Sequence, residues 1–225
     1  DVESGETRQV SDGEGEDSAP AWSPDGSTIA FVSDRGEERD LTNNTGAYSV
    51  SASGGDIEHL SEGLNSVAAL TWSPDGKAIA VAGSDVDGAN AGSQSWLFIL
   101  ESGRKPHKLT DDSISPAGGY APLVPAPEMR WTSDGRILFL AGHQGQISLY
   151  ALSIEGDELR QITAGGAGIG QVTFSAGAAR AIIQTLPTDS AGDLVLIDVE
   201  SGSTNQLTDY NQSFFQENPA ARVEK

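Results

Sequence analysis

The sequence predicts an all-β fold made of four-stranded antiparallel sheets that repeat along the chain, and three observations predict it. A fifteen-residue stretch, AWSPDGSTIAFVSDR from Ala21, returns as TWSPDGKAIAVAGSD from Thr71. Weaker copies read RWTSDGRILFLAGHQ from Arg130 and TFSAGAARAIIQTLP from Thr173. Around these copies, short segments alternate apolar and polar residues, and none keeps a helical period. Repeats of roughly 40 to 50 residues that hold four short strands each are typical of a β-propeller of the WD40-like kind.

The copies give the expected boundaries of the blades. Their aromatic residues, Trp22, Trp72, Trp131 and Phe174, are 50, 59 and 43 residues apart. A second signature, such as LESGRKPHKLTDD from Leu100, closes each unit with a Leu-Thr pair or its equivalent. We expect four complete blades at 18–61, 67–110, 127–163 and 170–208, a remnant of a preceding blade at 1–10, and an exit segment at 209–225. Because the remnant is surplus to the four blades, we expect the chain to be the C-terminal portion of a larger ring.

Within the first blade the strands follow from the pattern of apolar residues. Ile29, Phe31, Tyr48 and Val50 lie mostly at alternate positions, as half-buried strands require. The expected strands are 19–22, 27–33, 47–52 and 56–61. Only the stretch NQSFFQENPA, from Asn211, is expected to hold a helical turn.

Ser-Pro-Asp-Gly is a turn that reverses the chain between the first and second strands. Pro24 sets φ near −65° at its second position, Asp25 tolerates the third, and Gly26 accepts a positive φ. The equivalent turn residues in the next two blades are Pro74, Asp75, Gly76, Asp134 and Gly135. These repeated letters are therefore interpreted as structural, and we expect a positive φ at Gly26 and Gly76.

The aromatic residue before each turn is expected to pack between neighbouring blades. A large flat side chain at the end of an inner strand fills the wedge there. Trp22, Trp72 and Trp131 should therefore be largely buried. Replacing Trp72 with alanine should cost roughly 3–5 kcal/mol of unfolding free energy.

Composition limits the classes of partner. Thirty-three acidic residues against thirteen basic ones give a formal charge of −20, which repels phosphate backbones and disfavours nucleic-acid binding. Adaptation to high salt is a second explanation for the acidic excess, and melting that does not respond to added salt would count against it. The chain has no cysteine, so no disulfide or thiolate site is expected. No apolar run reaches the length of a membrane helix, so no membrane partner is expected.

The start of the chain bears on its origin. Because the sequence begins at Asp1 and its one methionine is Met129, we expect a processed, trimmed or partial product. With no signal peptide in view, a cytoplasmic location is expected.

The WSPDG turn, IAFVSDR and the closing Leu-Thr pair resemble the β-propeller of the prolyl oligopeptidase family of serine peptidases, in particular its acylaminoacyl-peptidase-like branch. The likeness covers the whole chain, and the tail QLTDYNQSFFQENPAARVE resembles the segment that leads from such a propeller into an α/β-hydrolase domain. Thr132 and Ser133 depart from the pattern in blade three, and FSAGA departs from it in blade four. The resemblance implies a propeller that caps a separate hydrolase domain carrying the Ser-Asp-His triad and that acts as a size filter for peptide substrates.

The chain itself shows no catalytic motif. The Gly-x-Ser-x-Gly elbow of α/β-hydrolases does not occur, and GSQSW from Gly92 lacks its second glycine. The histidines, His59, His107 and His143, are scattered and have no zinc-ligand spacing. No cofactor and no metal site is expected.

Two further stretches favour a structural interpretation. GGAGIGQV, from Gly165, is followed by a strand instead of the helix that would hold a pyrophosphate. SDVDGAN places Asp85 and Asp87 as a calcium loop does, but the twelfth position from Asp85 is Trp96 instead of glutamate. An inter-blade connection and a solvated hairpin loop are the expected outcomes.

The longest loops, 33–46, 83–94 and 111–128, should gather on one face. Long loops inside compact domains are often functional. Arg35, Arg39 and Tyr120 are therefore candidates for contact with substrate or with the hydrolase domain, and local pairing on the surface is their structural alternative.

Three functions remain open at this point. The first is the non-catalytic propeller portion of a prolyl-oligopeptidase-type peptidase, and the second is a stand-alone propeller of the periplasmic Tol type that serves as a protein-binding scaffold. The third, an enzyme with its site at the central channel, lacks a supporting cluster of carboxylates, histidines or metal ligands.

Overall fold

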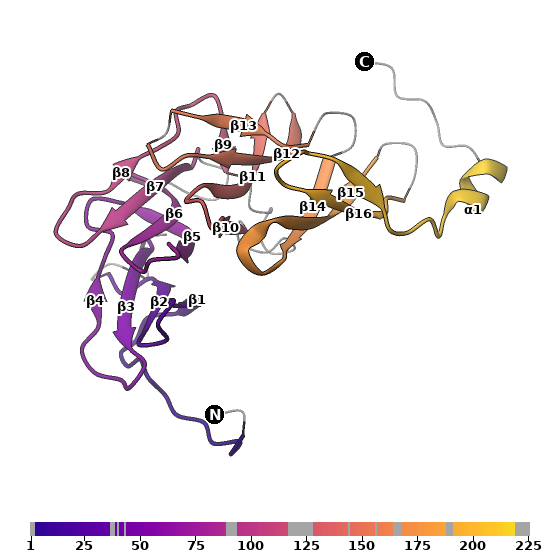
Figure 1. The fold of residues 1–225 in the computed structure, drawn as a ribbon. Coiled ribbons are helices and arrows are strands. Elements are labelled where there is room, and N and C mark those ends of the chain that lie inside the picture. Colours follow the sequence, from indigo (N-terminus) through magenta and orange to yellow (C-terminus); the bar gives the residue numbers. More distant parts are fainter. Residues whose placement is uncertain are drawn as a thin grey trace. The chain divides into compact units, whose positions relative to one another are not determined.

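The fold is nearly all β, as the sequence predicts (Figure 1). The structure is a computed structural model and describes residues 3–36, 39, 41–42, 44–88, 94–116, 128–143, 145–155, 157–163, 168–187 and 191–218. It divides into two compact units, Asp1–Leu109 and Thr110–Lys225. Each unit contains two antiparallel sheets whose strands follow the order of the chain, which is the blade arrangement of a β-propeller.

The first unit holds blades one and two. Blade one consists of β1 (Asp17–Trp22), β2 (Thr28–Ser33), β3 (Gly46–Ser51) and β4 (Glu58–His59). Blade two consists of β5 (Ser66–Trp72), β6 (Ala78–Ser84), β7 (Trp96–Glu101) and β8 (His107–Lys108). In both blades the fourth strand is only two residues long, which keeps the outer edge of the sheet short.

The second unit holds blades three and four. Blade three consists of β9 (Ser115–Pro116), β10 (Met129–Trp131), β11 (Ile137–His143), β12 (Gln146–Leu152) and β13 (Leu159–Gln161). Blade four consists of β14 (Gly168–Phe174), β15 (Arg180–Leu186), β16 (Leu194–Asp198) and β17 (Thr204–Gln206). The described helices are the 3₁₀ turn η1 (Ala176–Ala178) and α1 (Gln212–Glu217), so the expected helical turn near the C-terminus is confirmed.

The Ser-Pro-Asp-Gly turns adopt the conformation that their residues predict. The N–H of Gly26 donates to the carbonyl of Ser23 over 2.9 Å, and Gly26 and Gly76 both have a φ of 71°. The Asp25 carboxylate accepts hydrogen bonds from the Ser23 hydroxyl and from the N–H of Ser27. These bonds tie the turn together, which explains why the four letters are repeated.

The eroded copy in blade four keeps the closing hydrogen bond of the turn with other residues. The N–H of Ala178 donates to the carbonyl of Ser175, as Gly26 does to Ser23 in blade one. Ala178 has a φ of 57°, although it carries a side chain. The closing hydrogen bond is therefore kept, but the backbone differs, because Gly177 has a φ of 74° where its equivalent Asp25 has no positive φ. The positive φ of Ala178 carries some strain.

The closing Leu-Thr pair also has a structural role. The hydroxyls of Ser61, Thr163 and Thr208 accept the N–H of a residue in the third strand of their own blade, over 2.9 to 3.0 Å. The preceding residue donates its own N–H to the carbonyl of the same third-strand residue. The pair therefore anchors the short outer strand of the blade.

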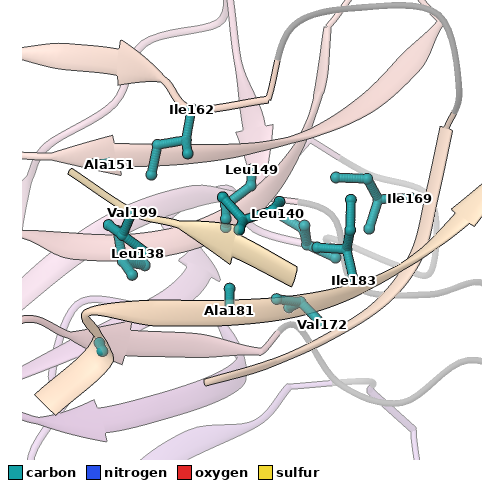
Figure 2. Close-up of a cluster of buried hydrophobic side chains, with 12 residues drawn as sticks. Leu138, Leu140, Leu149, Ala151, Ile162, Ile169, Val172, Ala181, Ile183 and Val199 are labelled. Atoms are coloured by element: carbon teal, nitrogen blue, oxygen red, sulfur yellow. The ribbon is translucent and has the colours of Figure 1, made fainter. Parts of the chain in front are cut away.

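Each unit has its own hydrophobic core between its two sheets. In the first unit, Ala30 and Val32 of blade one are buried in one cluster with Val81, Phe98 and Leu100 of blade two. Figure 2 shows the cluster of the second unit, in which side chains of blades three and four meet. Its labelled members are Leu138, Leu140, Leu149, Ala151, Ile162, Ile169, Val172, Ala181, Ile183 and Val199. Burial of each large aliphatic side chain contributes roughly 1.5–3 kcal/mol.

The three repeated tryptophans differ in burial, and the prediction for Trp22 is wrong. Trp131 is 7% exposed, whereas Trp22 is 62% exposed. Trp72 is partly buried against blade one, and its indole N–H donates to the carbonyl of Ala21. Trp22 has the same place in its own blade, but the described residues before β1 form no strand that covers it. Within the first unit, the preceding blade therefore decides the difference in burial between Trp72 and Trp22.

No helix in the described parts of the chain is long and apolar enough to cross a membrane.

Candidate functional site

One histidine lies beside a hydroxyl, as a base lies beside its nucleophile in a catalytic pair. His59 Nε2 is 3.2 Å from the Ser61 hydroxyl oxygen. Ser61 is fully buried, and its hydroxyl already accepts the N–H of Ala47. The same hydroxyl position in blades three and four supports the third strand without any histidine. The pair is therefore part of the blade structure, and its hydroxyl is out of reach of a substrate.

His59 itself is held by an aromatic neighbour. Its ring stacks on Tyr48, with ring centroids 4.7 Å apart. Burial lowers the pKa of His59, and the nearby Glu62 carboxylate opposes that shift. A nucleophile–base pair also needs an orienting acid on the base, and no carboxylate is hydrogen-bonded to His59 among the interactions of the described residues.

Among the interactions of the described residues, neither of the other two histidines pairs with a side-chain hydroxyl. His143 lies at the end of β11, where its Nδ1 is 2.9 Å from the carbonyl oxygen of Ser113. His107 lies on the exposed outer strand β8. Within the described residues, no group of three histidine, aspartate or glutamate side chains could hold a metal ion.

The guanidinium of Arg35 forms its contacts with neighbouring residues of the first unit. Its Nη2 contacts both carboxylate oxygens of Asp17, at 2.9 and 2.8 Å, and its guanidinium lies 5.5 Å from the centre of the Phe31 ring. Its other terminal nitrogen donates to the carbonyl of Asp12. The side chain is only 15% exposed, so its contacts connect the N-terminal segment to blade one. This arrangement favours the structural alternative, and a role in docking or substrate contact stays a prediction.

Arg39 pairs in a similar way, at 2.6 Å from the Glu14 carboxylate. The hydrogen bond to Arg39 is the main reason why the pKa of Glu14 is lowered. Tyr120 lies outside the described residues. The three candidates are therefore not brought together by the part of the chain that the structure describes.

The segment 111–128 has a place in the fold that differs from the expected one. Its first part does not simply connect two blades, because β9 pairs with Gly142 and Ala141 of β11. The strand then resumes at Met129, which pairs with Phe139 of the same β11. Residues 117–127, which lie between, are outside the described part. The long segment is therefore an insertion into the first strand of blade three.

The insertion falls where the other blades have a β-bulge. In blade two the register shifts between Val67 and Ala69, and in blade four it shifts between Ile169 and Gln171. A bulge re-aims side chains or interrupts pairing and is often placed beside a functional site. An insertion at that point extends an existing irregularity without changing the pairing on either side.

A spacing in the sequence could have located this insertion. Val67, Pro116 and Ile169 each lie seven residues after the leucine or isoleucine of a closing pair. From that residue to the aromatic residue of the turn there are five positions in blades two and four, but fifteen in blade three. Counting from the closing pair therefore shows an insertion of ten residues. This insertion accounts for the length of the segment that the sequence predicts to be a loop.

The two stretches with a structural interpretation agree with it where they are described. β14 begins at Gly168, so a strand follows the glycine-rich run. Asp85 forms an ion pair with Lys108 over 3.2 Å, and the Lys108 amine lies 3.5 Å from the centre of the Trp96 ring. The carboxylate is therefore neutralised by a lysine of its own blade.

No protein-family model and no curated protein sequence matches the chain. Solved structures do match. TolB from Acinetobacter baumannii is 25% identical with a TM-score of 0.62, over 86% of this chain and 44% of that one. A puromycin-hydrolyzing peptidase from Mycobacterium tuberculosis is 18% identical with a TM-score of 0.70, over 89% of this chain and 30% of that one.

A third structure extends the comparison to the expected branch. The acylaminoacyl peptidase of Pyrococcus horikoshii is 20% identical with a TM-score of 0.63, over 88% of this chain and 28% of that one. The chain thus spans less than half the length of each of these proteins. The structures similar to it include propeller regions of peptidases of the prolyl oligopeptidase family and TolB propellers, which confirms the predicted likeness at the level of fold.

Proposed function

We propose that the chain is the non-catalytic β-propeller portion of a serine peptidase of the prolyl oligopeptidase type. In this role it caps an α/β-hydrolase domain of the same parent protein and filters or positions oligopeptide or acyl-peptide substrates. The hydrolase domain supplies the nucleophile, the base and the acid.

Partial coverage is the observation that carries this proposal. The match to the puromycin-hydrolyzing peptidase takes in 89% of this chain but only 30% of the peptidase. A propeller portion that accompanies a separate catalytic domain has this relation to its parent. The arrangement of Ser61 and His59 supports the same assignment, because the hydroxyl nearest to a histidine is buried and engaged in the blade.

The insertion into the first strand of blade three supports a role in substrate selection. In a propeller the blades surround a central channel, and the first strand of a blade is its inner one. We propose that the ten extra residues in that strand narrow the route of a peptide. Tyr120, which lies in this segment, is the side chain that we propose for contact with the substrate.

A stand-alone propeller that binds other proteins is the second candidate. The likeness to TolB favours it. Its identity of 25% and its coverage of 44% of that chain both exceed the values for the two peptidase structures described above. In that case no hydrolase domain accompanies the blades, and their surface is the functional part.

Peptides of graded length test the filter. In the parent peptidase, shortening the insertion by removal of 118–126 should raise the length limit of the peptides that are cleaved. For short acyl-peptides it should raise KM, because the proposed Tyr120 contact is lost, and leave kcat unchanged. A matched shortening of the loop at 85–94 in blade two is the control. An unchanged length limit would contradict the filter, and a gene product that has no hydrolase domain would favour the scaffold.

A further inference from the structure

An arginine joins two blades of the second unit at their outer edge. Arg160, on β13 of blade three, donates from both terminal nitrogens to the carbonyls of Val199 and Glu200, each over 2.8 Å. These carbonyls belong to the turn between the third and fourth strands of blade four. A planar guanidinium suits two neighbouring oxygens because it presents two parallel N–H donors.

The same contact recurs in the first unit. Arg8 donates to the carbonyls of Ser53 and Ala52, over 2.6 and 2.7 Å, in the equivalent turn of blade one. Arg8 and Arg160 both lie two residues before the apolar residue of a closing pair. At both places, an arginine at this position therefore binds the outer turn of the blade that follows it in the chain.

Between blades one and two the arginine is replaced by an acid. The residue two positions before Leu60 is Glu58. Its register is the same, because Glu58 pairs with Ser49 in β3 as Arg160 pairs with Ala151 in β12. The guanidinium that makes this contact at Arg8 and Arg160 is thus absent here, and the charge at its position is reversed.

A groove opens at this junction. It has a volume of about 980 Å³ and lies within the first unit. Its lining includes Glu58, Glu62, Trp72 and the turn residues Ser102 and Gly103. Ser102 and Gly103 hold the positions in blade two that Ala52 and Ser53 hold in blade one, one and two residues after the last residue of the third strand. The groove thus occupies the place of the missing guanidinium.

The charges of the lining favour a cation. Lys77 and Arg104 are each paired with a neighbouring carboxylate, Asp75 and Glu101. In the described residues no ion pair engages Glu58 or Glu62. The third cation of the lining is Lys105, which is in none of the ion pairs of the described residues. Its positive charge weakens the attraction of the groove for a cation.

We propose that this groove binds the guanidinium of an arginine side chain carried by a peptide. The carboxylates of Glu58 and Glu62 supply the anionic acceptors. The turn of blade two differs from the others, because Gly103 has a φ of 72° where Ser53 and Glu200 have no positive φ. The carboxylates are therefore needed in addition to the turn carbonyls. A guanidinium is favoured over an ammonium because it is more weakly hydrated and binds two oxygens in one plane.

Titration of the full chain with Nα-acetyl-arginine amide, followed by backbone amide NMR, tests the proposal. Shifts should concentrate at Glu58, Glu62, Ser102 and Gly103. The citrulline analogue has the same shape without the charge, and it should bind roughly tenfold more weakly, as expected for loss of a charge-assisted contact. The lysine analogue should fall between the two.

Three variants complete the test. Glu58→Gln should weaken arginine binding roughly five- to tenfold. Glu158→Gln, the same change at an exposed position just before β13 of the second unit, should leave it unchanged. Glu58→Arg should abolish binding, because its own guanidinium occupies the groove. Equal shifts with arginine and citrulline, or shifts that survive Glu58→Arg, would overturn the proposal. This result is independent of whether the parent protein is a peptidase.

Discussion

At the scale of single residues, equivalent positions in the repeat do not have equivalent energies. Trp22 and Trp131 hold the same place before the turn, but one is 62% and the other 7% exposed. The sequence predicts where the turns lie, because glycine, proline and aspartate meet the φ requirements of particular turn positions. It does not predict how much area each side chain buries, because that depends on the neighbouring blade.

Replacement of the tryptophans by alanine should show this difference. Trp131→Ala should lower the unfolding free energy by roughly 3–5 kcal/mol, because a buried aromatic side chain is lost. Trp22→Ala should cost less than about 1 kcal/mol, and Trp72→Ala should fall between them. Urea unfolding measures all three. Equal losses at Trp22 and Trp131 would show that the exposed side chain is covered in solution.

The turn aspartates predict a dependence on acid. Hydrogen bonds from Ser23 and Ser27 lower the pKa of Asp25 to about 2. This pKa lies below the unfolded value of about 3.9. The stabilisation is therefore fully present above about pH 4 and is lost as the pH falls towards 2.

Asp25→Asn should flatten this part of the stability curve. Unfolding free energy measured between pH 5 and pH 2 should fall less steeply in the variant than in the parent chain. The carboxyl resonance of Asp25 provides the direct measurement. A midpoint near 4 would contradict the hydrogen bonding of the turn.

At the scale of elements, the closing pairs and the turns predict the strands, and the insertion into blade three is the main exception. Four strands of blade one were expected within two residues of their observed bounds, because alternating apolar residues and turn residues agree there. β9 was missed because its two residues are too short to show alternation. The proline-rich sequence after β9 does not show a strand pattern, so the sequence does not predict that β9 and β10 pair with the same strand.

Two deletions separate the insertion from the strand. Removal of 118–126 should leave the unit folded, with a melting temperature within a few degrees of the parent chain, because the pairing on both sides of it is kept. Removal of 113–116 should lower stability by roughly 2–5 kcal/mol, because Ile114 is 4% exposed and β9 is lost. Thermal unfolding followed by circular dichroism measures both. Unfolding by the first deletion would show that the insertion belongs to the core.

The arginine that joins blades three and four has an energetic role of its own. Arg160→Ala removes two hydrogen bonds from a charged donor to backbone carbonyls and should cost roughly 2 kcal/mol. Arg160→Lys keeps the charge but loses the planar pair of donors, so it should recover less than half of that loss. Arg180→Ala, at an exposed position of blade four, is the matched control and should have little effect. Full recovery by lysine would mean that charge alone is needed.

At the scale of the whole molecule, the fold is explained by the repeat, whereas the function that we propose places the reaction in a separate hydrolase domain. Among the described residues, the hydroxyl beside a histidine, that of Ser61, stabilises the pairing of strands within its blade. Resemblance of the repeat predicted the propeller, since turn chemistry is retained even at low identity. The sequence of these blades does not distinguish a peptidase from a binding scaffold, because the same strand and turn patterns occur in propellers of both.

We propose that these blades belong to a serine hydrolase whose catalytic residues lie outside them. The most direct test is to label the native gene product, recovered with an antibody raised against residues 1–225, with a fluorophosphonate probe, alongside the purified chain of residues 1–225. We expect a labelled polypeptide longer than the chain by a hydrolase domain, and no labelling of the chain alone. An unlabelled native product would contradict the peptidase assignment, and stoichiometric labelling of one serine in the chain alone would contradict its non-catalytic role.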